Sequence, residues 1–463
     1  LEFRRVLFRS DSKATRWGAL VIVAFTMMAA YYVNDVVAPL KTMLETDLAW
    51  SSTDFGFFTG GYSFLNVFFL MLIWGGLILD RFGIRFTGKL ATILMVGGTA
   101  LEYYAMTGLA GADATLFGIN EIFGYKTGVF VAFAGYSIFG VGAEVAGITV
   151  SKIIAKWFKG KELATAMGVQ VALARIGSQA GYAVAIPLAR AFGISTPVLL
   201  GLVLLLGGMI AFFIFAVMDK KLDKQMEAAA IAAGTEDEEE KFSFKDVKNI
   251  LVNPGFWLIA LLCVLFYSCV FPFQKFASEL MIIKYGINEN VAGTFAGLPA
   301  LGALILTPVF GGFIDKRGKS ASIMLLGSAM LICVHFIYAI PDINYWLVAI
   351  VLMIILGIAF SLVPSAMWPA VAKIFPVSQL GTAYALIFFI QNIGLWGIPT
   401  LIGWVLDAYC ISGKKPDGTN MYDYTVPMCI FTGIACLSLI VALLLKKADK
   451  KYGYKLEEPN IQK

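Results

Sequence analysis

The sequence is poor in the residues that build metal sites, disulfide frameworks and the active sites of soluble enzymes. Its 463 residues include a single histidine, His335, and six cysteines, none of which forms a CxxC pair or a cluster with histidine. We therefore predict no metal, no cofactor and no disulfide framework. Since no nucleophile is paired with a base in the sequence either, we do not expect an enzyme.

Charge is scarce as well. Asp, Glu, Lys and Arg make up 14% of the chain and apolar residues 59%, whereas soluble domains carry about 25% charged residues. This composition is typical of a membrane protein. The net charge of +5 is modest and follows from basic loops between apolar segments, so we expect no binding of nucleic acid. The absence of any Asn-x-Ser/Thr acceptor disfavours a glycosylated lumenal protein.

Twelve apolar segments are long enough to cross a bilayer, which takes about 20 helical residues. We predict an all-α polytopic membrane protein. Its spans are 17–38, 54–79, 88–109, 128–152, 163–189, 196–218, 255–280, 291–314, 320–340, 345–371, 379–405 and 425–446. An even number of spans puts both termini on one side. Lys and Arg gather after the second, fourth, eighth and twelfth spans, so this side is expected to be cytoplasmic.

The spans form two groups of six on either side of a long polar linker with an acidic run. We interpret this linker as a tether with one amphipathic helix near 242–251, and a regulatory segment is the alternative. The predicted division is an N-terminal tail or cloning remnant (1–16), an N-terminal six-helix bundle (17–218), a cytoplasmic linker (219–254), a C-terminal six-helix bundle (255–446) and a cytoplasmic tail (447–463). A second polar insertion, 410–424, is expected to be an ordinary loop, with a lid as the alternative.

The two groups repeat each other in sequence. GLILDRFGIR (76–85) follows the second span and GGFIDKRGK (311–319) the eighth, with Gly, Asp and basic residues in the same order. An Asp at the C-terminal end of a helix opposes the helix dipole, so each Asp needs a cationic or helix-N-terminal partner. We predict a conformational motif at the cytoplasmic face. Its residues are Gly76, Asp80, Arg81, Gly83, Arg85, Asp315 and Lys316.

A second repeat relates the stretch 139–181 to the other half at a constant offset of 217 (380 − 163), as in Leu163 and Leu380. The same offset places Ser361 opposite Glu144 and Asn392 opposite Arg175. One half therefore carries charges where the other carries neutral hydrogen-bonding groups. Two parallel six-helix halves with a site at the midplane between them are typical of transporters. We expect the N-terminal half to hold the substrate.

Glu144 and Arg175 are full charges inside apolar spans. At about 1.5 Å per residue both lie roughly 14–18 Å from the same face, near the middle of a ~30 Å hydrocarbon layer. Such charges are costly and mark functional sites. They form either a structural ion pair or a clamp for a zwitterion. We favour the clamp, because the attraction within a buried pair often falls short of its desolvation penalty. Glu144 would bind an ammonium, and Arg175 a carboxylate, bidentately where geometry allows.

Other polar and aromatic residues within the spans could line the same site, although helix–helix hydrogen bonds and packing are their usual roles. The predicted substrate-binding set adds Asn66, Tyr62, Gln170, Tyr267, Ser361, Trp368, Gln391 and Asn392 to the two charges.

Further residues are given structural roles. Asp35 is expected to be a charge at the outer interface, with a gate or a proton site as the alternative. Glu102 is also expected at the outer interface, and Lys275 is expected to extend to the outer face. Pro272, within FPF, is expected to break or kink its helix. His335 is interpreted as a packed residue.

The repeated motifs resemble the major facilitator superfamily, whose signature GLILDRFGIR fits almost completely. FGVGAEVAG (139–147), ARIGS (174–178), MWPAVA (367–372) and QLGTAYALIFFIQNIGL (379–395) are similar to its lysosomal dipeptide uniporter branch. The resemblance covers most of the membrane core. It implies facilitated transport of dipeptides by alternating access, with Glu144 and Arg175 as the charged site residues.

We therefore expect a monomeric carrier in a lipid bilayer that moves dipeptides or similar small zwitterions. One alternative is a proton-coupled or exchange transporter of small organic anions, in which Glu144 carries the proton. The alternative from another class is a non-transporting receptor or scaffold. Because no acidic dileucine signal precedes the first span, we expect a bacterial inner (plasma) membrane, or the lysosomal membrane if the chain is eukaryotic.

Overall fold

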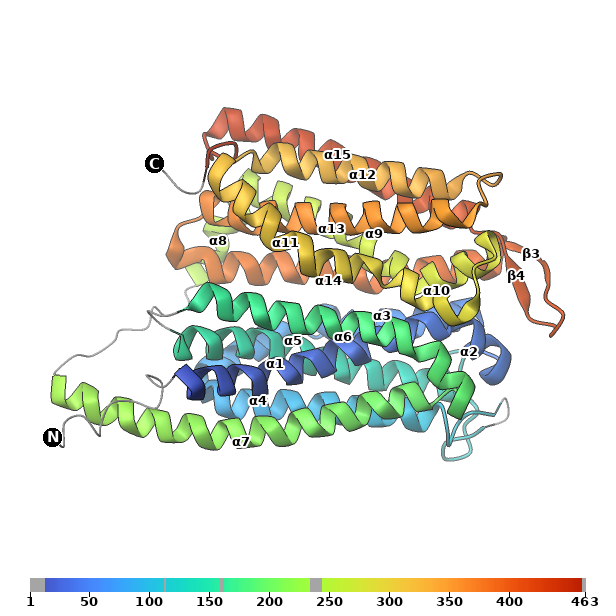
Figure 1. Cartoon of the computed structure of the whole chain (residues 1–463), viewed down its shortest axis with the longest axis horizontal. Helices are drawn as coiled ribbons and strands as arrows, with labels where there is room; N and C mark the ends of the chain where they lie inside the picture. Colours follow the sequence, from blue (N-terminus) through green and yellow to red (C-terminus); the bar gives the residue numbers. More distant parts are fainter. Residues whose placement is uncertain (1–12, 112–113, 159–161, 234–243, 460–463) are drawn as a thin grey trace.

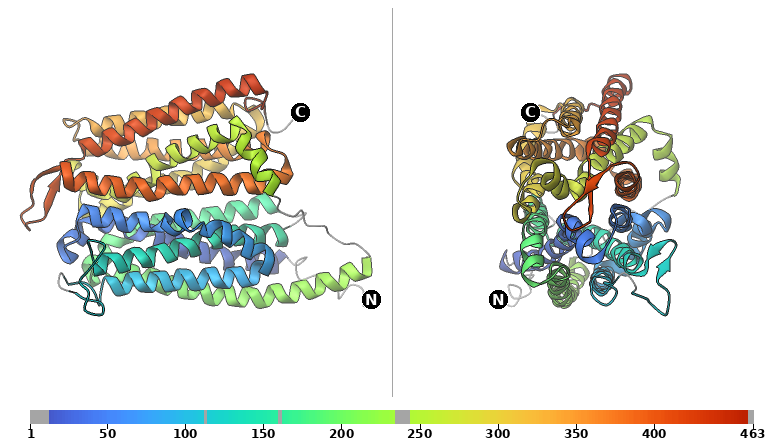
Figure 2. Two further views of the ribbon diagram at one scale, coloured as in Figure 1. Left: turned by 180° about the vertical axis from the view of Figure 1, so that it is seen from behind. Right: turned by 90° about the vertical axis from the view of Figure 1, so that its right-hand side faces the viewer.

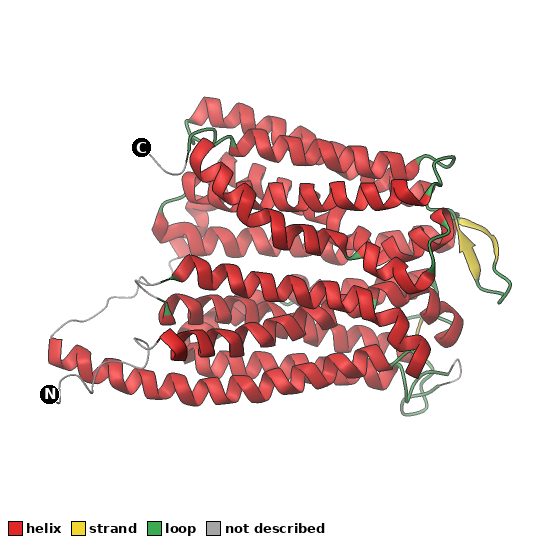
Figure 3. Ribbon diagram, viewed as in Figure 1, coloured by secondary structure: helices red, strands yellow, loops and turns green. Residues whose placement is uncertain are grey.

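Long, nearly parallel helices in two stacked bundles make up this computed structural model (Figures 1 and 3). It describes residues 13–111, 114–158, 162–233 and 244–459. The N-terminal half holds α1 (Lys13–Val36), η1 (Ala38–Leu40), α2 (Lys41–Leu48), α3 (Ser52–Phe68), α4 (Met71–Ala105), β1 (Glu121–Ile122), β2 (Tyr125–Lys126), α5 (Thr127–Trp157), α6 (Leu163–Phe192) and α7 (Thr196–Ala233).

The C-terminal half holds α8 (Phe244–Val252), α9 (Pro254–Tyr285), α10 (Glu289–Ala296), α11 (Leu298–Arg317), α12 (Ser320–Ala339), α13 (Trp346–Ile374), α14 (Val377–Tyr409), β3 (Ile411–Lys414), β4 (Asn420–Tyr422) and α15 (Thr425–Tyr452). Strands β3 and β4 pair antiparallel and protrude at one end of the bundles, which we call the hairpin end (Figure 3). The described ends of the chain lie at the opposite end, the termini end (Figure 1).

The helical membrane fold is confirmed. Every predicted span falls on helices, and nine helices in the described residues are long and apolar enough to cross a membrane. The number is ten if α3 and α4, bent by 58° at a short break, are counted as one span. The twelve spans, the exact domain limits and the cytoplasmic side of the termini stay predictions.

Helix α4 contains a reversal of the chain at Gly83, whose φ of 74° and ψ of 173° are not helical. A Cβ on Gly75 would meet Val145 of α5, and one on Gly98 would meet Phe139 of the same helix. In an unbroken helix Gly75 and Gly98 would lie about 35 Å apart, but their two contacts on α5 are only about 9 Å apart. The chain therefore turns back at Gly83, where glycine accepts a positive φ that other residues resist.

Several segments expected to be polar loops or tails have structure. Helix α7 runs past the predicted span to Ala233, into the segment expected to be a polar linker. Helix α8 covers 244–252 and confirms the helix expected near 242–251, and residues 234–243 lie outside the described residues. Beyond α15 the tail returns to α12, where Glu457 accepts hydrogen bonds from the backbone N–H and the hydroxyl of Ser322. This carboxylate caps the positive end of α12.

Helix α9 is continuous from Pro254 to Tyr285, so Pro272 does not break it, and the kink that was the other expectation stays a prediction. Proline removes one backbone donor and crowds the preceding turn. In that turn the carbonyl of Cys269 lies 3.0 Å from Nε2 of His335, which supplies a hydrogen bond from outside the helix. His335 is fully buried and stacks on Phe431, which confirms it as a packed residue.

The two halves meet closely where α3 crosses α14 near the hairpin end. A Cβ on Gly56 would lie 2.4 Å from the carbonyl oxygen of Pro399 and 3.0 Å from Cα of Gly403. Small residues of this kind let membrane helices approach backbone to backbone. The contact is reinforced by Asp407, whose carboxylate accepts from the backbone N–H groups at the start of α3, including that of Thr53 at 2.6 Å.

At the termini end the repeated segments are not packed in this way. A Cβ on any of Gly76, Gly83, Gly311 and Gly312 would meet no atom within 4 Å. In this conformation the two halves therefore pack together at the hairpin end.

Gly56→Ala is expected to lower the thermal unfolding midpoint in detergent by several degrees. The added methyl group would clash with backbone atoms of α14, and overpacking of this kind costs about 1–3 kcal/mol. Gly97→Ala is the matched control, because a Cβ there meets nothing within 4 Å. Equal midpoints for the two variants would mean that α3 and α14 do not pack as described.

Candidate substrate site

Glu144 lies near the middle of α5 and is only half-buried. Its carboxylate accepts a hydrogen bond of 3.0 Å from the hydroxyl of Tyr62 on α3. Tyr62 reaches this position because α5 carries glycine opposite it: a Cβ on Gly140 would lie 2.0 Å from the carbonyl oxygen of Tyr62. Among the described residues no Lys or Arg pairs with Glu144.

Arg175 lies near the middle of α6 and is also half-buried. Its guanidinium carbon is 5.6 Å from the ring centre of Tyr31 and 4.8 Å from that of Phe360. Within the described part of the chain it has no hydrogen-bond acceptor and no acidic partner. Because Phe360 belongs to α13, the arginine lies at the contact between the two halves.

The two charges therefore do not form the structural ion pair that was the alternative interpretation. Arg175 lies over the ring of Tyr31, and the charge of Glu144 also acts on the hydroxyl of Tyr31, so both charges lie near this residue. Each keeps part of its surface free. Unpaired charges are stabilised poorly in a membrane core, and a ligand that carries both signs would complement both.

The remaining predicted residues of the N-terminal half have mixed surroundings. Gln170 is half-exposed and precedes Arg175 on α6. Asn66 follows Tyr62 by one turn of α3 but is 1% exposed, and neither atom of its amide has a hydrogen-bond partner in the described structure. Tyr62 is thus placed against Glu144, whereas Asn66 lies beneath the surface.

The C-terminal half presents aromatic rings toward Arg175. Tyr267 stacks on Phe271 at 5.4 Å and meets Phe360 at 6.2 Å between ring centres. Trp368 lies 6.5 Å from Tyr267 and stacks on Phe388 at 4.8 Å. The structure therefore brings Tyr267 and Trp368 together with the arginine through Phe360.

The neutral polar residues expected in this half are buried, and two of them donate hydrogen bonds within their own helices. Ser361 donates to the carbonyl of Gly357 and Asn392 to that of Phe388, both one turn back along the same helix. Gln391 is 8% exposed and lies 3.4 Å from the sulfur of Cys263. These three residues remain candidates from the sequence without a contact to the charged pair.

In the first copy of the predicted conformational motif, the Asp has a cationic partner of the kind that it was expected to need. Asp80 pairs with Lys152 of α5 at 3.0 Å. Arg85 lies 3.9 Å from Asp219 of α7, a buried carboxylate that also accepts from Lys156 at 2.8 Å. In the second copy Asp315 and Lys316 occupy the last turn of α11, and Arg81 of the first copy lies over the ring of Phe82.

For three charged residues the sequence predicted the wrong surroundings. Lys275 is 9% exposed and does not extend to the surface: its ammonium pairs with Asp35 across the two halves at 3.1 Å. Asp35 also accepts from Ser178 at 2.6 Å. Glu102 is fully buried, so it is not part of an interfacial belt.

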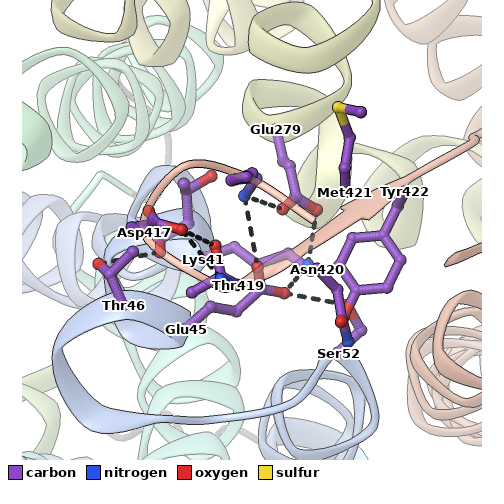
Figure 4. A network of polar contacts seen from close by, with 12 residues as sticks. Lys41, Glu45, Thr46, Ser52, Glu279, Asp417, Thr419, Asn420, Met421 and Tyr422 are labelled. Carbon is purple, nitrogen blue, oxygen red and sulfur yellow. Dashed lines mark hydrogen bonds and ion pairs between the residues drawn. The ribbon is translucent and has the colours of Figure 1, made fainter. Parts of the chain in front are cut away.

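A network of four charged residues closes the hairpin end (Figure 4). The ammonium of Lys41 is 1% exposed and pairs with Glu45 of α2 and with Glu279 of α9. Lys415, between β3 and β4, lies 3.7 Å and 3.8 Å from the same two glutamates. Segment 410–424 is therefore a hairpin that lies across both halves, not an ordinary loop (Figure 2, right).

Two pseudo-equivalent helical bundles that meet around unpaired charges define a membrane carrier. The sequence model of the Major Facilitator Superfamily matches residues 20–399 and 276–458. The chain belongs to this superfamily and is a multi-pass membrane transporter, not an enzyme.

Curated relatives agree with this family. The lysosomal dipeptide transporter MFSD1 of Homo sapiens is 29% identical over 454 residues, which cover 95% of this chain and 88% of the relative. MFSD1 of Danio rerio is 26% identical over 441 residues, covering 93% and 86%. The chain is thus similar to the branch that its motifs resemble.

Solved structures share the fold at low sequence identity. The nucleoside transporter NupG has a TM-score of 0.68 with 12% identity, covering 92% of this chain and 98% of that one. A bacterial homologue of the human lysosomal transporter Spinster, inward-facing and unoccupied, has a TM-score of 0.62 with 14% identity, covering 98% and 99%.

Proposed function

We propose that this transporter carries dipeptides, or small zwitterions of similar size, by facilitated diffusion. The observation that carries the proposal is the presence of two half-buried charges, Glu144 and Arg175, that both lie near Tyr31 and do not pair with each other in the described structure. A free dipeptide presents an ammonium and a carboxylate separated by its backbone. Glu144 binds the first and Arg175 the second, each through charge-assisted hydrogen bonds. The names of the curated relatives support the same substrate class.

A site that binds only the charged ends of a dipeptide makes no specific contacts with its side chains, so many dipeptides should be accepted. Tyr62 orients the Glu144 carboxylate through its hydrogen bond. The aromatic rings of Tyr267 and Trp368 offer apolar walls on the opposite half. Asn66, Gln170, Ser361, Gln391 and Asn392 are secondary candidates that would contact substrate only after a change of conformation or through water.

We further propose that the termini end faces the cytoplasm and that the protein works as a monomer, in a bacterial inner membrane or, if the chain is eukaryotic, in the lysosomal membrane. The basic residues that follow the second, fourth, eighth and twelfth predicted spans support this orientation. In that orientation the conformation described is closed toward the outside. Alternation between this state and one that is closed toward the cytoplasm then moves the substrate across the membrane.

Capped peptides test the proposal. In proteoliposomes that contain the purified protein, an unlabelled free dipeptide should compete with uptake of a labelled dipeptide. Its N-acetyl and C-amide forms should each compete at least tenfold more weakly, because each lacks one charge of the pair.

The same competition separates the alternatives. A transporter of organic anions would accept the N-acetyl form as well as the free dipeptide, and a symporter would accumulate substrate when a proton gradient is applied. Saturable uptake by vesicles with protein, against none by empty vesicles, excludes a non-transporting receptor.

A further inference from the structure

Arg175 is a cation without an acidic partner in the described structure, and something must hold its long side chain in place. Its neighbours are two aromatic faces: Tyr31 of α1 at 5.6 Å and Phe360 of α13 at 4.8 Å from ring centre to guanidinium carbon. Both distances lie within the range of about 6 Å in which an aromatic ring attracts a cation.

Phe360 is itself fixed. Its ring is 2% exposed and packs at 5.3 Å on Phe271 and at 6.2 Å on Tyr267, both from α9. The ring that faces the arginine is therefore part of a rigid cluster in the C-terminal half. A ring that was free to move would lose more side-chain entropy than this fixed ring when it holds the guanidinium in place.

We propose that Phe360 is a positioning residue for Arg175: its ring holds the guanidinium by the face and leaves the N–H edges free for the carboxylate of the substrate. A guanidinium is planar, stacks through its face and donates hydrogen bonds from its edge. A carboxylate in the place of the ring would occupy that edge and compete with the ligand. This inference rests on the proposed function, because it assigns the carboxylate to Arg175.

The contact also joins the two halves, because Arg175 belongs to α6 and Phe360 to α13. The ring can orient the arginine only while the halves are close at this level. The grip on the carboxylate is therefore strongest in conformations that keep α6 and α13 together.

Phe360→Leu tests the proposal, because leucine keeps an apolar side chain but has no aromatic face. The KM of a free dipeptide should rise roughly five- to thirtyfold with little change in kcat, whereas Phe360→Tyr should stay within about twofold of the wild type. Competition by the C-amide of the same dipeptide should be unchanged by Phe360→Leu, since the amide has no carboxylate for Arg175.

Phe256→Leu is the matched control: Phe256 is a buried ring of the same half that packs on Trp257 and Phe375, away from Phe360, so its KM should match the wild type. Equal losses for the free dipeptide and its amide, or an equal effect of Phe256→Leu, would overturn the positioning role. If Phe360→Leu does not fold, Phe360→Met carries the same comparison.

Failure of this inference is distinguishable from failure of the proposed function. A wild-type protein that transports no dipeptide refutes the function, and the Phe360 comparison then uses whichever carboxylate it transports. A wild-type protein that transports dipeptides while Phe360→Leu keeps its KM refutes the positioning role alone.

Discussion

Glu144→Gln and Arg175→Lys should each reduce dipeptide uptake by about 30-fold or more while leaving the protein folded. Glutamine can still bond to Tyr62 but gives the substrate ammonium no opposite charge. Lysine keeps the charge but loses the bidentate edge and the flat face that stacks on Phe360. A lost hydrogen bond to a charged group costs about 1.5–3 kcal/mol, and more where the ligand charge stays buried without a partner.

Uptake into proteoliposomes measures the loss, and the thermal unfolding midpoint without substrate shows whether the fold is intact. Arg190→Lys is the control for arginine, because Arg190 lies on the same helix and pairs with Glu289 at its far end. Glu121→Gln, at an exposed strand, is the control for glutamate. Uptake that survives in either site variant contradicts the clamp.

Lys41→Met should destabilise the protein by about 3–5 kcal/mol, the cost of leaving a buried ionic partner uncompensated. Lys41 is 1% exposed and is the shared cation of Glu45 and Glu279, so its loss leaves two buried carboxylates facing each other with only the more distant Lys415 nearby. Thermal or denaturant unfolding in detergent measures the effect.

The double variant Lys41→Met with Glu279→Gln should recover part of the stability, because it removes one of the two stranded charges. Lys152→Met is the control: its pair with Asp80 is exposed, and such pairs contribute about 1 kcal/mol or less. Similar losses from Lys41→Met and Lys152→Met would show that the network is not buried as described.

The sequence predicts what depends on local chemistry. Apolar length locates the helices, and a charge in mid-span marks Glu144 and Arg175 as costly and therefore as candidate site residues. The partner of Asp80 is predicted in kind, since a carboxylate at a helix C-terminus needs a cation, and Lys152 supplies it. Resemblance then indicates the family, which the sequence model and the curated relatives confirm.

What the sequence does not predict are contacts between residues far apart in the chain. Lys275 and Asp35 each look like interfacial charges along their own helices, but they meet 240 positions apart and are buried together. Lys415 looks like part of a polar loop, and only the fold brings it to Glu45 and Glu279. For each residue the burial is decided by a partner that local pattern does not identify.

Phe360 was missed for a related reason. A phenylalanine in an apolar span is normally expected to contact lipid or to pack against other helices. The role proposed for Phe360 depends instead on a guanidinium from the other half. One signal was available: Phe360 precedes Ser361, which the internal repeat places opposite Glu144. The repeat thus pointed to the turn of α13 that contacts Arg175 but favoured the neutral hydroxyl over the neighbouring ring.

The ion pairs that join the two halves in the described part of the chain balance in sign. Lys41 and Lys415 offset Glu45 and Glu279, Lys275 offsets Asp35, and the site itself holds one charge of each sign. A zwitterion adds no net charge to this set. Moving one elementary charge through the membrane potential involves about 2.3 kcal/mol per 100 mV. Because these paired groups and their cargo sum to zero, rearranging them involves little electrical work, and the membrane voltage should neither drive nor oppose transport.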